Sequence, residues 1–425
     1  MISKNIRCSR RLQIIAIALL LISACFAQDL SHRDYFPPLT NGDGQRYPLG
    51  ISPLTWHLVG SGIYPVKGSD GRTHLAYALM FTNSFSMPAT IKSVEVLDPA
   101  RGYQVSGKNR VLDVRNEDVT GQVKLFTLPN SMDKASYTTQ VPSGQSGVMF
   151  FDVSYDDPSQ VPKAIAHRVT VTVPPNPHNI TELTATSPPV RLGPEAMVIA
   201  RPFTGDGWVN GNGCCLEIGP HRFVTNPLNG TLEPSETFAI DWVKLGPNGH
   251  EYRTDGKKPE DWYCYGVDVL AVAPGTVVEV VRDLPDVEPL KSPQGLAIDQ
   301  YPGNRVLVDM GAGHYAMYAH LVRNSIPVQV GDYVQQGQKL GLLGNSGNST
   351  GPHLHFQLMD RPSGLDATSL PFVIDRMQLE GRVSVDVQTM VDDMDKKADV
   401  PIDKSAAGMQ VRTMPLTRDI DDFGK

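Results

Sequence analysis

The sequence has few features that favour binding to nucleic acid or a lipid bilayer, or a fold made of helices. Acidic residues outnumber basic ones by 45 to 38, which gives a formal net charge of −7. This balance argues against binding to nucleic acid and leaves no basic patch for anionic lipids. The apolar run at residues 14–22 is too short to span a bilayer. No long helical period occurs in residues 28–173, and the 38 glycines and 34 prolines favour a β-rich fold with many turns.

Cysteine is also scarce. The chain has five, of which Cys8 lies in the N-terminal segment described below. In an oxidising compartment we expect a disulfide between Cys264 and one member of the pair Cys214-Cys215. The pair could instead be two small buried side chains. Metal ligation is the weaker alternative, because the spacing matches no standard zinc pattern.

The N-terminus predicts export. Basic residues precede the apolar run, as in a secretory signal peptide. We therefore assign residues 1–27 to a signal peptide and expect a periplasmic or extracellular protein. Two processing routes remain open, because Ala27 suits an ordinary cleavage site while Cys25 ends a lipobox-like segment. A lipid on Cys25 would be the chain's means of membrane attachment.

Residues 28–190 are predicted to form an immunoglobulin-like β-sandwich and a linker. Short strands with period-2 alternation, such as residues 168–173, are separated by turn clusters. Residues 174–194 are rich in Pro, Thr, Ser and Asn, which is typical of a linker. We find no cluster of catalytic residue types in this part of the sequence. It could serve as a spacer or bind an envelope protein.

The segment at residues 344–356 carries the strongest chemical signal. It contains His353-Leu354-His355 after a Gly/Asn/Ser-rich lead-in, followed by an apolar run. In a strand, residues two apart point to the same face, so both imidazoles would project together. Such a pair suits a metal site or a proton-transfer site. The alternative is a pair of ordinary polar histidines on an exposed strand face.

This segment resembles, nearly letter for letter, the signature of the lysostaphin-type, LytM-like zinc endopeptidases, which cut peptide crosslinks of bacterial peptidoglycan. Further segments of the same pattern occur upstream in the family's order, at residues 269–278, 318–321 and 330–341. The resemblance covers roughly residues 196–375. It implies a mostly antiparallel β peptidase domain at residues 191–375, after the sandwich, in a mostly β chain. Residues 376–425, rich in charge, are predicted to be a mobile extension.

The resemblance also implies roles for individual residues. In the family, a His and an Asp four residues apart hold zinc together with the second His of His-x-His. Asp241 and His355 match metal ligands of this family, and His320 and His353 match its two catalytic histidines. The position for the first zinc histidine, four before Asp241, is occupied by Thr237, whose hydroxyl is a poor zinc ligand.

Three explanations of Thr237 follow. His221, in the loop upstream, could supply the third ligand, or Glu236 could, although it would face away from Asp241 in a regular strand. The metal could be weakly bound or of another kind. Alternatively the groove could be catalytically inactive and kept for binding.

We therefore expect an exported metalloendopeptidase with one zinc per chain, held by Asp241, His355 and His221, that hydrolyses peptide bonds in peptidoglycan crosslinks. His320 and His353 would assist the attack of water. The alternative is a catalytically inactive relative that binds wall peptide or regulates another wall hydrolase.

Overall fold

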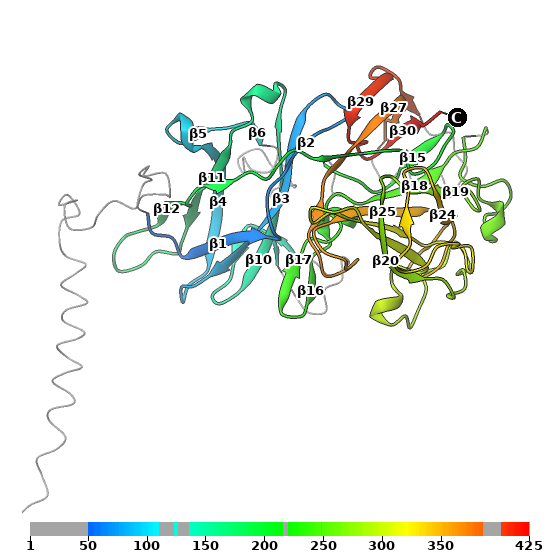
Figure 1. Cartoon of the computed structure of the whole chain (residues 1–425). Coiled ribbons are helices and arrows are strands. Elements are labelled where there is room, and N and C mark those ends of the chain that lie inside the picture. Colours follow the sequence, from blue (N-terminus) through cyan, green and yellow to red (C-terminus); the bar gives the residue numbers. More distant parts are fainter. Residues whose placement is uncertain are drawn as a thin grey trace, which may run out of the picture. The chain divides into compact units, whose positions relative to one another are not determined.

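The computed structural model describes residues 50–109, 123–125, 136–215, 220–247, 249–385 and 401–424, all within one compact unit, Gly50–Lys425. These residues are nearly all β (Figure 1). The predicted signal peptide and Cys25 lie outside the described residues. Within those residues, no helix has the length and apolar character needed to cross a membrane.

Two sheets form the N-terminal β-sandwich, defined here as residues 54–191. The first sheet runs in the order β1 (Leu54–Val59), β3 (Thr73–Asn83), β10 (Ser146–Tyr155), β7 (Val123–Leu125) and β8 (Ser136–Thr138), with β2 (Pro65–Lys67) beside β3 and β6 (Lys108–Asn109) beside β10. The second runs β12 (Glu182–Thr186), β11 (Ala164–Thr172), β4 (Ala89–Asp98) and β5 (Gln104–Val105), with β13 (Val190–Arg191) beside β11 and β9 (Gln140–Val141) beside β4.

Alternation of apolar and polar residues explains the strands of the sandwich. In β11, Val169 and Val171 are buried while Thr170 and Thr172 are half-buried. The valines join an apolar core that also contains Phe151. The predicted linker is wrong, because β12 and β13 lie within residues 174–194 and both pair with β11. The more specific immunoglobulin-like assignment stays a prediction.

A larger sheet of 13 strands, called the large sheet below, follows in the chain. Its order is β14 (Met197–Ile199), β27 (Phe372–Val383), β30 (Asp419–Asp422), β15 (Trp208–Asn210), β18 (Ile240–Lys244), β25 (Leu354–Met359), β22 (Tyr315–Ala319), β21 (Arg305–Asp309), β20 (Gly275–Val281) and β23 (Tyr333–Val334), with β26 (Ser369–Leu370) beside β25, and β28 (Ile402–Asp403) and β29 (Gly408–Thr413) beside β27.

Two separate two-stranded sheets accompany the large sheet. They are β16 (Asn226–Leu228) with β17 (Thr231–Glu233), and β19 (Asp268–Leu270) with β24 (Lys339–Leu342). Short helical turns lie between the strands: α2 (Pro220–Phe223), η2 (Pro99–Arg101), η6 (Pro158–Gln160), η7 (Pro259–Asp261) and η8 (Ile298–Gln300).

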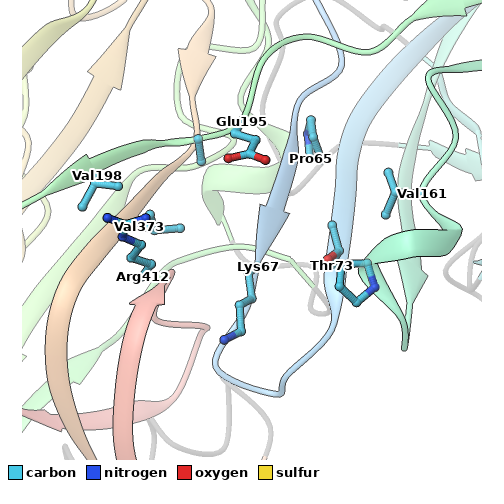
Figure 2. A pocket seen from close by; sticks show the side chains of 10 residues that line it. Pro65, Lys67, Thr73, Val161, Glu195, Val198, Val373 and Arg412 are labelled. Atoms are coloured by element: carbon cyan, nitrogen blue, oxygen red, sulfur yellow. The ribbon is translucent and has the colours of Figure 1, made fainter.

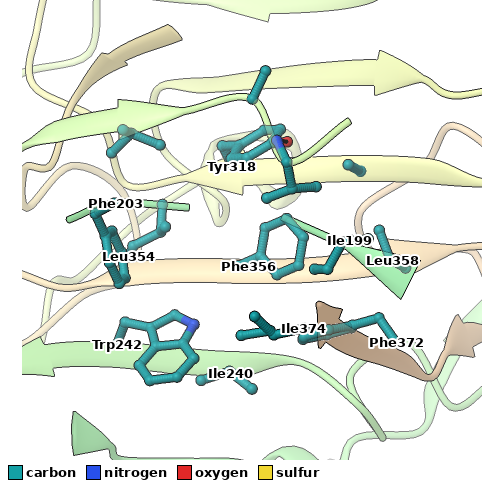
Figure 3. Close-up of a cluster of buried hydrophobic side chains, with 14 of the residues drawn as sticks. Ile199, Phe203, Ile240, Trp242, Tyr318, Leu354, Phe356, Leu358, Phe372 and Ile374 are labelled. Carbon is teal, nitrogen blue, oxygen red and sulfur yellow. Dashed lines mark hydrogen bonds between the residues drawn. The ribbon is translucent and has the colours of Figure 1, made fainter. Parts of the chain in front are cut away.

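The apolar core of the large sheet fixes which side chains point to its other face. Trp242 on β18 and Leu354 and Phe356 on β25 are fully buried in this core, where Figure 3 shows them together. Successive side chains of a strand alternate between faces. Asp241 and His355 therefore project away from the core, side by side.

The prediction of a mobile C-terminal extension is wrong for residues 376–383, which belong to β27, and for residues 401–424. The latter segment forms β28, β29 and β30, and β30 lies between β27 and β15. Asp419 and Asp421 of β30 are fully buried, and Arg382 Nε donates to Asp419 Oδ1 at 2.7 Å. From the sequence alone these acidic residues predict a solvated tail, because Arg382, the partner of Asp419, is distant from it in the sequence. The remaining charged stretch, residues 386–400, lies outside the described residues.

A cavity of about 370 Å³ lies where β2, β14, β27 and β29 come together (Figure 2). Its charged lining residues are Lys67, Glu195 and Arg412. All three side chains are exposed. Neither Asp241 nor His355 lines it, so the cavity is separate from the chemistry predicted above.

Candidate active site

The centre of the site is set by strand register. Strands β18 and β25 pair antiparallel, with Asp241 directly opposite His355. Directly opposed side chains on one face of such a pair lie close together. Here His355 Nδ1 is 3.0 Å from Asp241 Oδ1.

Asp241 is a half-buried carboxylate surrounded by nitrogen atoms. Asn212 Nδ2 donates to its Oδ2 at 2.8 Å, and His221 Nε2 lies 3.1 Å from the same oxygen. His353 Nε2 lies 3.4 Å from Oδ1. Burial favours the neutral acid, but the positive charges of His221 and His353 outweigh it and hold the pKa of Asp241 well below its usual range. The carboxylate is therefore ionised and able to bind a cation.

His221 reaches the site from outside the large sheet. It lies on the single turn α2, and its side chain is 5% exposed. Its Nδ1–H donates to the carbonyl of Ala239 at 3.2 Å, which directs Nε2 at Asp241. Burial opposes the charged imidazole, but Asp241 and, more weakly, Glu236 raise the pKa of His221 to about 9.

Glu236 lies close to His221 in the site, whereas the side chain of Thr237 is buried. β18 begins only at Ile240, so Glu236 is not part of a regular strand. Its Oε2 lies 3.8 Å from His221 Nε2, and the expectation that it faces away from the site is wrong. Thr237 is buried, while His221 is brought beside Asp241 from 20 residues upstream in the sequence.

His221, Asp241 and His355 are suited to hold a metal ion. Each offers a ligand atom, and these atoms all lie within 4.8 Å of one another. Two imidazoles and a carboxylate are a donor set that zinc accepts, with a fourth position open. The carbonyl bonded to His221 Nδ1–H fixes the tautomer in which Nε2 is the ligand.

Gln357 orients His355, a role that was not predicted. Its Oε1 lies 2.8 Å from His355 Nε2. When Nε2–H donates to this amide oxygen, Nδ1 is left with its lone pair toward Asp241 and the metal position. Gln357 follows His355 by two residues on β25, so the strand period was a signal that could have identified it.

His353 lies next to these residues, directly before β25. Its Nδ1–H donates to the carbonyl of Gly351 at 2.8 Å, and Ser349 Oγ lies 3.2 Å from the same nitrogen. Burial lowers the pKa of His353, but the charge of Asp241 outweighs burial and raises it above its ordinary value. This imidazole can therefore carry a proton near neutral pH.

His320 has the opposite character. It follows β22 in the left-handed region with φ +62°, and its Nδ1–H donates to the carbonyl of Ser346 at 2.7 Å. The ring centroids of His320 and His353 are 4.6 Å apart. Burial, and then the neighbouring His353 and His355, hold the pKa of His320 well below its usual range. A neutral imidazole with Nδ1 protonated presents a free lone pair on Nε2.

The cysteines lie outside this cluster, and their expected pairing is wrong. Cys214 and Cys215 are joined to each other, and Cys264 is a buried free thiol whose Sγ donates to the carbonyl of Pro352 at 3.0 Å. Cys214 and Cys215 are neighbours in the sequence and need no long-range contact to meet, and all three cysteines pack in the same core. Burial raises the pKa of the Cys264 thiol.

Comparison with known proteins points to one peptidase family. Residues 261–367 match the model of Peptidase family M23, a range that includes His320, His353 and His355. Asp241 and His221 precede it. A peptidoglycan DD-endopeptidase of Vibrio cholerae, ShyA, is 42% identical over 67 residues, which are 16% of this chain and 15% of that protein. Lysostaphin of Staphylococcus simulans is 40% identical over 96 residues, 22% of this chain and 18% of that protein.

The structural likeness is broad but weak. The catalytic domain of lysostaphin from Staphylococcus simulans matches 40% of this chain and 88% of its own length, with 23% identity and a TM-score of 0.21. Likeness at this level carries no argument about activity. The chain's matches to ShyA and lysostaphin span less than a fifth of either relative's length. Within those bounds, residues 261–367 of this chain match the model of Peptidase family M23.

Proposed function

We propose that this protein is an exported zinc metalloendopeptidase that hydrolyses peptide bonds of bacterial peptidoglycan crosslinks. Export is inferred from the sequence of residues 1–27 alone. The substrate class is inferred from relatives named as peptidoglycan endopeptidases. The observation that carries the chemistry is the set His221, Asp241 and His355, whose ligand atoms all lie within 4.8 Å of one another.

Zinc would be held by His221 Nε2, an oxygen of Asp241 and His355 Nδ1. When bound, zinc supplies Lewis acidity that polarises a peptide carbonyl and makes water more acidic. Asp241 neutralises part of the metal charge, and Asn212 and Gln357 keep Asp241 and His355 in place.

The other two histidines divide the proton transfers. His320 is neutral, and its free Nε2 accepts a proton from the attacking water, while the Ser346 carbonyl holds the ring. His353 has a raised pKa and can carry a proton on Nε2, which it donates toward the oxyanion or the leaving amine. The opposite pKa shifts of adjacent imidazoles support this assignment of base and acid.

Metal content and hydrolysis together test the proposal. The purified mature protein should hold about one zinc, and His355→Ala and His221→Ala should each lower zinc occupancy after dialysis. Wild-type protein should release new amino groups from purified peptidoglycan, and His320→Ala should not.

One outcome would favour a binding protein over an enzyme. A protein that takes up no zinc in excess metal, yet sediments with peptidoglycan, would contradict the enzyme proposal. It would instead support the alternative in which the groove binds wall peptide without cleaving it.

A further inference from the structure

His221 differs from Asp241 and His355 in what holds it. Those two residues sit on adjacent strands whose register fixes their separation. His221 sits on α2, which has 4 residues, too few for a helix that is stable by itself. One backbone bond, from Val224 N to the His221 carbonyl at 3.2 Å, accompanies the turn. The orientation of His221 must therefore depend on tertiary contacts of α2.

The next residue on α2 makes such a contact with the N-terminal β-sandwich. Arg222 is 4% exposed, and its Nη2 donates to the carbonyl of Phe151 at 2.8 Å. Phe151 lies on β10 of the sandwich, 71 residues away in sequence. A hydrogen bond from a charged donor to a buried carbonyl is stronger than one between neutral groups. It therefore connects the turn carrying His221 directly to another part of the fold.

The anchor in the sandwich is a well-packed one. Phe151 is fully buried, pairs with Tyr77 of β3, and its ring stacks on that of Tyr77 at 4.9 Å. The adjacent Asp152 is buried and bonded to His74, with Oδ1 2.9 Å from His74 Nδ1. The Phe151 carbonyl therefore belongs to a paired strand in a packed core.

We propose that the N-terminal β-sandwich is part of the metal site, because its strand β10 holds Arg222 and thereby positions the neighbouring ligand His221. Arg222 is a positioning residue and touches neither metal nor substrate. This inference rests on the proposed zinc site. It gives the sandwich a definite role beyond that of a spacer.

Three variants test the role of the Arg222 bond. Arg222→Met removes the donors and keeps much of the volume, whereas Arg222→Lys keeps a charged N–H donor of similar reach. Ser69→Ala is the matched control. Ser69 lies in the sandwich and bonds Asp419 and Arg382 of the large sheet, so it joins the same two parts of the fold away from His221.

The readout is the zinc dissociation constant, measured by competition with a chromophoric chelator on the full chain. We expect Arg222→Met to raise the constant about tenfold or more, as loss of partners that orient metal ligands does. Arg222→Lys should restore most of the affinity, and Ser69→Ala should leave it unchanged. A folded Arg222→Met protein with wild-type zinc affinity would overturn the inference, as would equal weakening in Ser69→Ala.

A measurement on the wild-type protein covers the case in which Arg222→Met does not fold. Amide hydrogen exchange, with and without zinc, should show added protection in peptides covering β10, because coupling between sites is reciprocal. Unchanged exchange there would contradict the inference. The experiment also separates this inference from the proposed zinc site. If the zinc site itself is wrong, His221→Ala binds zinc as tightly as the wild-type protein does.

Discussion

Zinc affinity should depend steeply on pH, because a proton competes for the ligand atom of His221. The ordinary pKa of a histidine is near 6.5. Burial lowers the pKa of His221, but the charge of Asp241 outweighs burial and raises this pKa to about 9 in the metal-free protein. The shift is upward, so the imidazole is protonated below about pH 9 and must lose its proton before Nε2 can bind a metal.

The size of the effect follows from the distance between the pKa and the working pH. At pH 7, two units below a pKa of about 9, only about one imidazole in a hundred is neutral, so the apparent affinity falls on the order of 100-fold below its limit. The affinity should rise about tenfold per pH unit between pH 7 and 9 and then level off. His353, whose pKa is also raised, would add to this slope if its proton leaves at the same time.

Isothermal calorimetry in buffers of different ionisation enthalpy measures the protons released on zinc binding, and chelator competition at pH 7, 8 and 9 measures the slope. At pH 7 we expect about one proton from His221. His221→Gln should bind zinc more weakly and with a flatter slope, and His353→Gln separates any second proton. A wild-type affinity that is constant from pH 7 to 9 after correction for the chelator would refute the reasoning.

Three further predictions follow from the same contacts. Gln357→Leu removes the acceptor for His355 Nε2, so zinc affinity should fall ~10- to 100-fold by chelator competition, and an unchanged affinity would show that the amide does not orient His355. His320→Ala should lower kcat on peptidoglycan ~100-fold or more while zinc content stays at the wild-type level; a parallel loss of zinc would assign it to metal binding instead. Asp421→Asn should raise the free energy of unfolding at pH 7 by about 1–2 kcal/mol in urea titration. Burial holds the pKa of the Asp421 carboxyl well above its ordinary value, and neither oxygen has a hydrogen-bond partner within the described residues, so ionisation of this group destabilises the fold as pH rises. The exposed Asp375→Asn is the control, and destabilisation by Asp421→Asn would contradict the argument.

Local patterns in the sequence were sufficient for the strand-borne part of the site. The period of a strand places His353 and His355 on one face, and the same period pairs buried Trp242 with outward Asp241. The sequence also named His221 as a candidate. It could not say that a turn outside the large sheet would bring this side chain within 3.1 Å of Asp241.

The residues that support the site were harder to foresee. Asn212 reaches Asp241 from 29 residues away, and no spacing rule connects them. Glu236 was placed by assuming a regular strand, but the strand begins later, at Ile240. Tertiary contacts decided both cases, and a pattern of neighbours in sequence does not contain them.

The C-terminal strands were not predicted, for a related reason. Asp419 and Asp421 flank Ile420, so the segment has the pattern of a polar stretch with one apolar residue. In the fold, Ile420 packs with Val209 and Val383, and Arg382 neutralises Asp419. A charged strand in the middle of a sheet is recognisable only when its distant partner is known.

The position of β30 also constrains the timing of folding during synthesis. This strand joins β15 to β27, and β15 in turn pairs with β18, which carries Asp241. A nascent chain that has not yet been extended through residue 422 therefore has a gap in the sheet next to the strands of the site. Late completion of the sheet would leave the site unfinished while the polypeptide is still being made, until β30 has docked between β27 and β15.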